Sequence, residues 1–138
     1  MKATAEHEVE TKTAIFRNTR AFSSFSVNDV KKAAKFYGET LGLDVVEKKE
    51  GLELHISGCS PVFVYPKGNH VPATFTILNF QIDDIDETVA ELTKRGARFE
   101  VYRDGEMKTD EKGIARGHGM KIAWFKDPAG NFLSVIES

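Results

Sequence analysis

The 138-residue chain is 41% hydrophobic and carries 19 basic against 21 acidic residues, for a formal net charge of −2. That size and apolar fraction suit one domain with a single core, and the balanced charge, without a basic patch, argues against nucleic acid or a membrane surface as a partner. The single cysteine, Cys59, excludes an internal disulfide and, with no signal-peptide-like or membrane-spanning apolar run in view, indicates a cytoplasmic protein.

Residues 1–18 are a predicted polar N-terminal arm, dominated by Glu, Lys and Thr, that need not be ordered by itself. Ile15 and Phe16 interrupt the polar end of this arm. If the arm packs on a second chain, we expect these two side chains to be its anchors.

The rest of the chain contains two similar modules, expected at 19–66 and 74–138. Phe-Ser-Val-Asn-Asp-Val at 25–30 matches Phe-Gln-Ile-Asp-Asp-Ile at 80–85, an offset of 55. Each stretch predicts a strand end that leads into a capped helix, and a glycine follows each helix. The cap candidates are Asn28 or Asp29 and Asp83 or Asp84, and the terminating glycines are Gly42 and Gly96.

Three strands are expected after each helix, which gives the order β-α-β-β-β twice. They are predicted over 43–48, 52–57 and 61–65, and over 98–103, 120–125 and 132–137. The fold class is therefore α+β, with tandem βαβββ modules that form curved mixed sheets around a cleft and carry their helices outside. The polar, glycine-containing stretch 104–119 has no counterpart in the first module and is a candidate lid.

A tight turn precedes the last strand. Asp127 suits the first position of a type I turn, Pro128 the second and Gly130 the fourth. This turn, within Trp-Phe-Lys-Asp-Pro-Ala-Gly-Asn at 124–131, and the paired helix starts resemble the glyoxalase, bleomycin-resistance and extradiol-dioxygenase superfamily, also called vicinal oxygen chelate proteins. The resemblance covers about 19–137 and implies a single glyoxalase-like domain over 19–138, and by analogy a homodimer.

The metalloenzymes of that superfamily hold a divalent ion with His, Glu or Gln at four strand positions. Carried onto this chain, the resemblance places those positions at Phe22, Val64, Ile77 and Ser134. Phe, Val and Ile offer no lone pair to a cation, and a neutral serine hydroxyl alone is a poor ligand. We therefore expect no metal and no other cofactor.

Strand alternation predicts which side chains face the cleft. The expected wall is apolar and aromatic with a few neutral hydrogen-bonding groups, as a small-molecule site requires. The predicted ligand-binding residues are Phe22, Ser24, Val64, Ile77, Asn79, Gln81, Trp124 and Ser134. The alternative is that the same residues fill a collapsed core.

Two histidines are catalytic candidates. His55 alternates with Leu52, Leu54 and Ile56, so it lies with Glu53 on a polar strand face that is either in the cleft or simply exposed. His118 lies between two glycines, next to the strand that leads to Trp124. Either imidazole could carry a proton near neutral pH.

These observations favour a small-molecule binding protein that resembles the drug-sequestering members of the superfamily and needs no metal. One alternative is a lyase or dioxygenase, similar to lactoylglutathione lyase, whose reaction depends on a metal. The other is a metal-free enzyme on the same scaffold.

Overall fold

The computed structural model describes residues 14–138. Its first module is a four-stranded sheet with one helical segment. The strands lie in the order β1-β4-β3-β2; β1 and β4 are parallel and the other pairs are antiparallel. The elements are β1 Ser24–Val27, α2 Val30–Lys35, the π-helical turn η1 Phe36–Thr40, β2 Asp44–Lys48, β3 Gly51–His55 and β4 Val62–Pro66.

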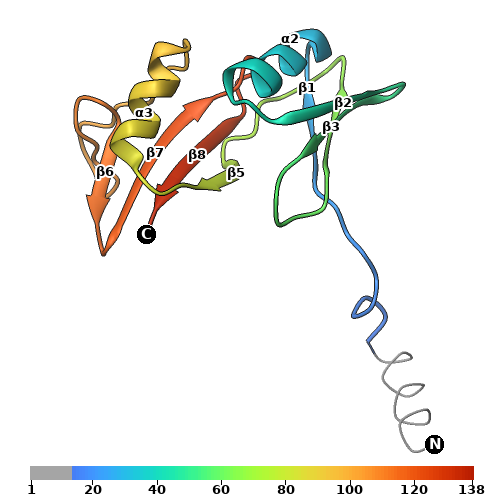
Figure 1. The fold of residues 1–138 in the computed structure, drawn as a ribbon, viewed down its shortest axis with the longest axis horizontal. Helices are drawn as coiled ribbons and strands as arrows, with labels where there is room; N and C mark the ends of the chain where they lie inside the picture. The colour runs from blue at the N-terminus through green and yellow to red at the C-terminus, as the bar shows by residue number, and fades with distance from the viewer. Residues whose placement is uncertain (1–13) are drawn as a thin grey trace, which may run out of the picture.

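The second module repeats this plan with the strand order β5-β8-β7-β6, in which β5 and β8 are parallel. Its elements are β5 Thr76–Gln81, α3 Ile85–Lys94, β6 Ile114–Gly117, β7 Met120–Lys126 and β8 Phe132–Glu137. Figure 1 shows the two modules side by side, with the N-terminal segment leaving the first module beside β1. The two mixed four-stranded sheets, each with its own helix, confirm the predicted α+β class and the tandem modules.

Both helices begin and end with the residue types that the sequence predicts. The carboxylate of Asp29 accepts a hydrogen bond from the backbone N–H of Lys32, and that of Asp84 accepts one from Glu87. Gly42 and Gly96 have positive φ angles of 74° and 103°, which glycine adopts without a Cβ clash. The chain can therefore reverse direction after η1 in the first module and after α3 in the second.

One predicted strand is displaced in the second module. Residues 98–103 contain only an isolated bridge between Phe99 and Phe125, and the strand next to β7 is β6, within the stretch predicted as a loop. A turn at Asp110 explains the difference: its carboxylate accepts backbone hydrogen bonds from Lys112 and Ile114, which leads the chain into β6.

The core lies between each sheet and its helix, and the modules join at η1. Tyr37 of η1 is fully buried and donates a hydrogen bond of 2.7 Å to Asp127 in the β7–β8 turn. Next to it, the rings of Phe36 and Phe125 lie 6.3 Å apart. Because these contacts cross the module boundary, the two cores form one cluster.

Asp127 also confirms the predicted turn, since its backbone C=O accepts a hydrogen bond from Gly130, three residues on.

Within residues 14–138, no helix combines the length and the apolar content that crossing a membrane requires. Of the predicted arm, 1–13 lie outside the described residues, and the remainder includes a turn that leaves Ile15 and Phe16 exposed.

Candidate functional site

Each sheet has an open face, which we define as the face turned away from its helix. In the first sheet, Leu52, Leu54 and Val64 are fully buried on the helix side. Phe63 and Tyr65 alternate with Val64 along β4, and their rings stack on the open face with centroids 6.3 Å apart. Val64 therefore lies in the core, contrary to the prediction that it lines the cleft.

The repeat shows which residue of the first sheet corresponds to Ser134. Ser24 pairs with Phe63, and Asn79 pairs with Ser134. Ser24 and Asn79 are separated by the same offset of 55 that relates the two modules. Phe63, rather than Val64, is thus the counterpart of Ser134, and the prediction was displaced by one residue.

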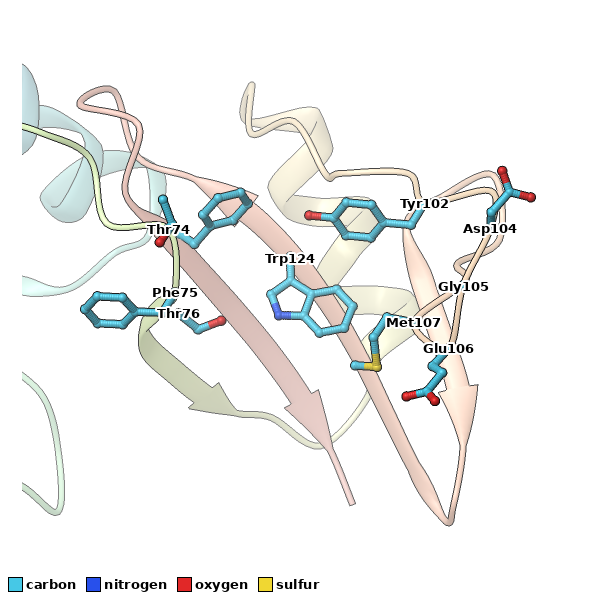
Figure 2. A pocket seen from close by; sticks show the side chains of 10 residues that line it. Thr74, Phe75, Thr76, Tyr102, Asp104, Gly105, Glu106, Met107 and Trp124 are labelled. Atoms are coloured by element: carbon cyan, nitrogen blue, oxygen red, sulfur yellow. The ribbon is translucent and has the colours of Figure 1, made fainter.

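A pocket of about 430 Å³ lies on the open side of the second module, and we call it the Trp124 pocket. The pocket lies where the segment that leads into β5 meets the loop after α3 and the strands β7 and β8. The lining residues are Thr74, Phe75, Thr76, Tyr102, Asp104, Gly105, Glu106, Met107, Trp124 and Phe132. In Figure 2 the Trp124 indole lies between Phe75 on one side and Tyr102 and Met107 on the other.

Aromatic packing and two hydrogen bonds hold one wall of this pocket. The rings of Tyr102 and Trp124 meet edge to face with centroids 5.9 Å apart. The backbone N–H of Thr109 donates to the carbonyl of Tyr102 at 2.8 Å, and the N–H of Tyr102 donates to the Thr109 hydroxyl at 3.0 Å. Burial, and then the nearby Glu100 carboxylate, raise the pKa of Tyr102, so its phenol is neutral at pH 7.

Polar side chains lie on the same strands, next to the Trp124 pocket. Ser134 is fully buried, and its hydroxyl donates a 2.6 Å hydrogen bond to the side-chain oxygen of Asn79. Trp124 is the neighbour of Ser134 on β7. With its hydroxyl bonded and no surface exposed, Ser134 does not line the Trp124 pocket.

A second pocket, of about 370 Å³, lies on the first module, and we call it the Phe22 pocket. Its lining residues are Arg20, Ala21, Phe22, Glu53, Ser60, Pro61 and Phe63. Phe22 has 68% of its surface exposed. The two pockets share no residue, and each draws its lining from only one module or from the segment directly before it.

The predicted site residues thus separate into three groups. Phe22 lines one pocket and Trp124 the other. The residues that lie on or near the open faces without lining either pocket are Ser24, Ile77, Asn79, Gln81 and Ser134. Val64 lies in the core.

His55 is exposed on β3, with its Nε2 atom 3.0 Å from the Glu53 carboxylate. His118 is exposed in the β6–β7 turn with a positive φ of 54°.

Sequence reasoning missed most of the wall formed by the loop after α3. Tyr102 falls in the predicted strand 98–103 and Met107 in the candidate lid 104–119, so the sequence pattern places neither in the wall of a pocket. Phe75 stands in the segment between the modules and has 69% of its surface exposed. Its exposure as a large apolar side chain is a signal that only the structure provides.

The donor set at the positions implied by the resemblance does not fit a divalent ion. Phe22 is exposed, Val64 is buried on the helix side, and the Ser134 hydroxyl is engaged by Asn79. Replacing Val64 with its open-face counterpart Phe63 adds no donor. Within residues 14–138, no three His, Cys, Asp or Glu side chains are grouped so that they could hold a metal together.

A family model described as "Glyoxalase/Bleomycin resistance protein/Dioxygenase superfamily" matches residues 21–135. A search of curated proteins finds no match to the chain. The structure is similar to that of TnmS3, an antibiotic binding protein from Streptomyces sp. CB03234, with 25% identity and a TM-score of 0.62 over 87% of this chain and 97% of that one.

Two further solved structures share the fold. The glyoxalase family protein from Enterococcus faecalis is 20% identical, with a TM-score of 0.64 over 88% of this chain and 99% of that one. The fosfomycin resistance protein FosX from Listeria monocytogenes is 14% identical, with a TM-score of 0.66 over 88% of this chain and 93% of that one.

Proposed function

The chain belongs to the Glyoxalase/Bleomycin resistance protein/Dioxygenase superfamily, and from this premise we propose that it binds a small aromatic molecule in the Trp124 pocket without using a metal ion. The observation that carries the proposal is the composition of the wall. Phe75, Tyr102, Trp124 and Phe132 surround a space of about 430 Å³. Apolar area of this kind supplies affinity, and a few polar groups fix the orientation of the ligand.

Similarity to a binding protein supports this choice over an enzyme. TnmS3 is an antibiotic binding protein and is 25% identical over nearly its whole length. Sequestration requires no reacting group. The side chains at the four positions Phe22, Val64, Ile77 and Ser134 support the metal-free part of the proposal, because they do not provide the donors that a divalent ion needs.

We further propose that the protein is a homodimer in which the Phe22 pocket of one copy faces the Trp124 pocket of the other. Phe22 and Phe63 belong to one half-site, and Phe75 and Trp124 to the other. Each half-site leaves large apolar side chains in contact with solvent, and Phe22 and Phe75 are each more than two-thirds exposed. Pairing two copies would bury both patches and enclose the ligand on two sides. A cytoplasmic location remains a prediction from the composition.

Binding can be tested with Trp124 because it is the only tryptophan in the chain. Two- and three-ring aromatic compounds should change its fluorescence in a saturable manner. By calorimetry, Trp124→Ala should weaken binding at least about tenfold, since stacking on one aromatic ring contributes on the order of 1 kcal/mol beyond the area it buries. Val101→Ala is the matched control, because Val101 is exposed near Tyr102 but does not line the pocket.

The metal-free claim has its own measurement. Elemental analysis of the purified protein should give far less than one transition-metal ion per chain, and a chelator should leave ligand affinity unchanged. A stoichiometric metal whose removal abolishes binding would contradict the proposal.

A metal-free enzyme is the second candidate, and one contact favours it. The imidazole of His55 and the carboxylate of Glu53 form a 3.0 Å pair on the open face of the first sheet, and Glu53 lines the Phe22 pocket. A carboxylate that orients an imidazole is a common arrangement for a general base. Ligand turnover with a bell-shaped pH–rate profile, abolished in His55→Gln, would favour this candidate over sequestration.

A further inference from the structure

We infer that the Trp124 pocket selects aromatic ligands that carry a positive charge, and that Glu106 recognises that charge; the inference rests on the proposed function of the same pocket. Two independent features point to a cation. One is the negative charge of the ionisable side chains in the lining, and the other is the group of aromatic side chains that line the same pocket.

The ionisable side chains of the lining are acidic apart from the Tyr102 phenol. They are Asp104 and Glu106, and within residues 14–138 no lysine, arginine or histidine lines the pocket. In Figure 2 the Glu106 carboxylate lies next to Met107, on the Trp124 side of the loop, whereas the Asp104 carboxylate points away from Trp124. Glu106 is therefore the residue expected to meet a ligand, and Asp104 adds only a more distant field.

The loop that carries Glu106 is tied at both ends. The paired hydrogen bonds between Tyr102 and Thr109 close it, and Gly105 supplies the positive φ of 90° at its tip. Thr109 is buried, with 8% of its surface exposed. The closure fixes the backbone at both ends of the segment, which places the exposed Glu106 side chain at the edge of the pocket.

Aromatic rings attract cations through their electron-rich faces. One lining ring already does so within the chain, because the Lys126 ammonium lies 4.9 Å from the centroid of Phe132. Lys126 also lies 3.7 Å from the Glu100 carboxylate, which offsets part of its charge beside Phe132. Trp124, the strongest aromatic partner for a cation, is at the centre of the lining.

Three naphthalene compounds of nearly equal size separate charge from shape. They are 2-naphthylmethylammonium, 2-naphthalenemethanol and 2-naphthoate, measured by equilibrium dialysis against the 138-residue chain at pH 7. We expect the ammonium compound to bind at least about fivefold more tightly than the alcohol, because a partly exposed charge contact contributes about 1 kcal/mol. The carboxylate compound should bind most weakly. The preference should shrink in 0.5 M NaCl, because screening weakens it.

Variants assign the charge recognition to one residue. Glu106→Gln should remove most of the difference between the ammonium compound and the alcohol, and Asp104→Asn should remove less. Glu111→Gln makes the same change of charge in the same connection between α3 and β6, but Glu111 lies beyond Thr109 and does not line the pocket, so it should leave the difference unchanged. Circular dichroism of each variant checks that the fold is intact.

The outcomes distinguish this inference from the proposed function. Equal binding of the three compounds, or a preference for the ammonium compound that survives in Glu106→Gln, would overturn the inference alone. Failure of all three compounds to bind would overturn the proposed function together with it.

Discussion

Asp127 occupies a buried position between the modules, with only 4% of its surface exposed. Its carboxylate accepts hydrogen bonds from the Tyr37 phenol, from the backbone N–H groups of Ala129 and Asn131, and from the Asn131 side chain. Asn131 in turn donates to the carbonyl of Ser26 in the first module. One carboxylate therefore organises both the turn and the module junction.

Removing this carboxylate should be costly. Asp127→Ala leaves the phenol of Tyr37 and the amide of Asn131 buried without their acceptor, so we expect the free energy of unfolding to fall by about 3–5 kcal/mol. Urea denaturation curves of both proteins, fitted with a common m-value, measure the change in the free energy of unfolding. Asp104→Asn, at an exposed site, is the control. A loss below about 1 kcal/mol would mean that the network is not a stabilising element.

Tyr37 gives the molecule a predictable response to alkaline pH. Burial first, and then the charge and hydrogen bond of Asp127, raise the pKa of its phenol far above the ordinary value of 10. The folded state therefore keeps its proton where the unfolded state loses it, so the stabilisation is complete below pH 10 and declines as pH rises above it. At pH 8 the free energy of unfolding of wild type should exceed that of Tyr37→Phe by about 2 kcal/mol, because wild type has one more hydrogen bond to a charged group.

The difference between wild type and Tyr37→Phe should then shrink by up to about 1.4 kcal/mol per pH unit above pH 10, because the substituted chain has no phenol to titrate at that position. Denaturation curves for both proteins between pH 8 and pH 11 measure it, and the other tyrosines and the lysines cancel in the comparison. A difference that stays constant across this range would contradict the assigned role of the phenol.

At the scale of elements, Gly113 determines where β6 begins. Its φ is +94°, and a Cβ at this position would lie 2.8 Å from the Cβ of Phe99 and 2.9 Å from the carbonyl oxygen of Glu100. Both strain and collision therefore oppose a side chain there.

Gly113→Ala should accordingly lower the free energy of unfolding by about 2–4 kcal/mol. Gly58→Ala is the matched control: Gly58 also has a positive φ, of +84°, but nothing lies within 4 Å of its added Cβ, so only the backbone strain of about 1 kcal/mol is expected. Equal losses in the two variants, measured by thermal denaturation, would show that the collision contributes nothing.

The same region shows why part of the second module escaped prediction. Local chemistry determines caps and turns, so Asp29, Asp84 and the turn at Asp127 were predictable from the residues alone. The edge partner of β7 depends instead on which of two competing segments reaches it. The Asp110 turn brings Ile114 opposite Ala123, while the backbone of residues 98–103 pairs with β7 only through Phe99 and Glu100. Such tertiary competition leaves no local signature.

At the scale of the whole molecule, the aromatic content and Trp124 could be anticipated, but the division of the site into two pockets could not. A strand's side chains change faces with every residue, so a displacement of one position exchanged Val64 for Phe63. In the proposed homodimer, which module faces which would be a property of the assembly, and the sequence pattern of one chain carries no information on it. The turn before β1 offers a test of that proposed assembly.

Ile15 and Phe16 have 69% and 81% of their surfaces exposed although they belong to a hydrogen-bonded turn. If the homodimer forms as proposed and these side chains pack on the second copy, burying both contributes about 3–5 kcal/mol per arm. The double substitution of Ile15→Ser with Phe16→Ser should therefore raise the dimer dissociation constant at least about a hundredfold, as measured by sedimentation equilibrium. Phe16→Leu, which keeps an apolar side chain, should change it less than tenfold. A double variant that dimerises as wild type does would exclude the arm from the interface, while leaving the two half-sites free to meet through Phe22 and Phe75.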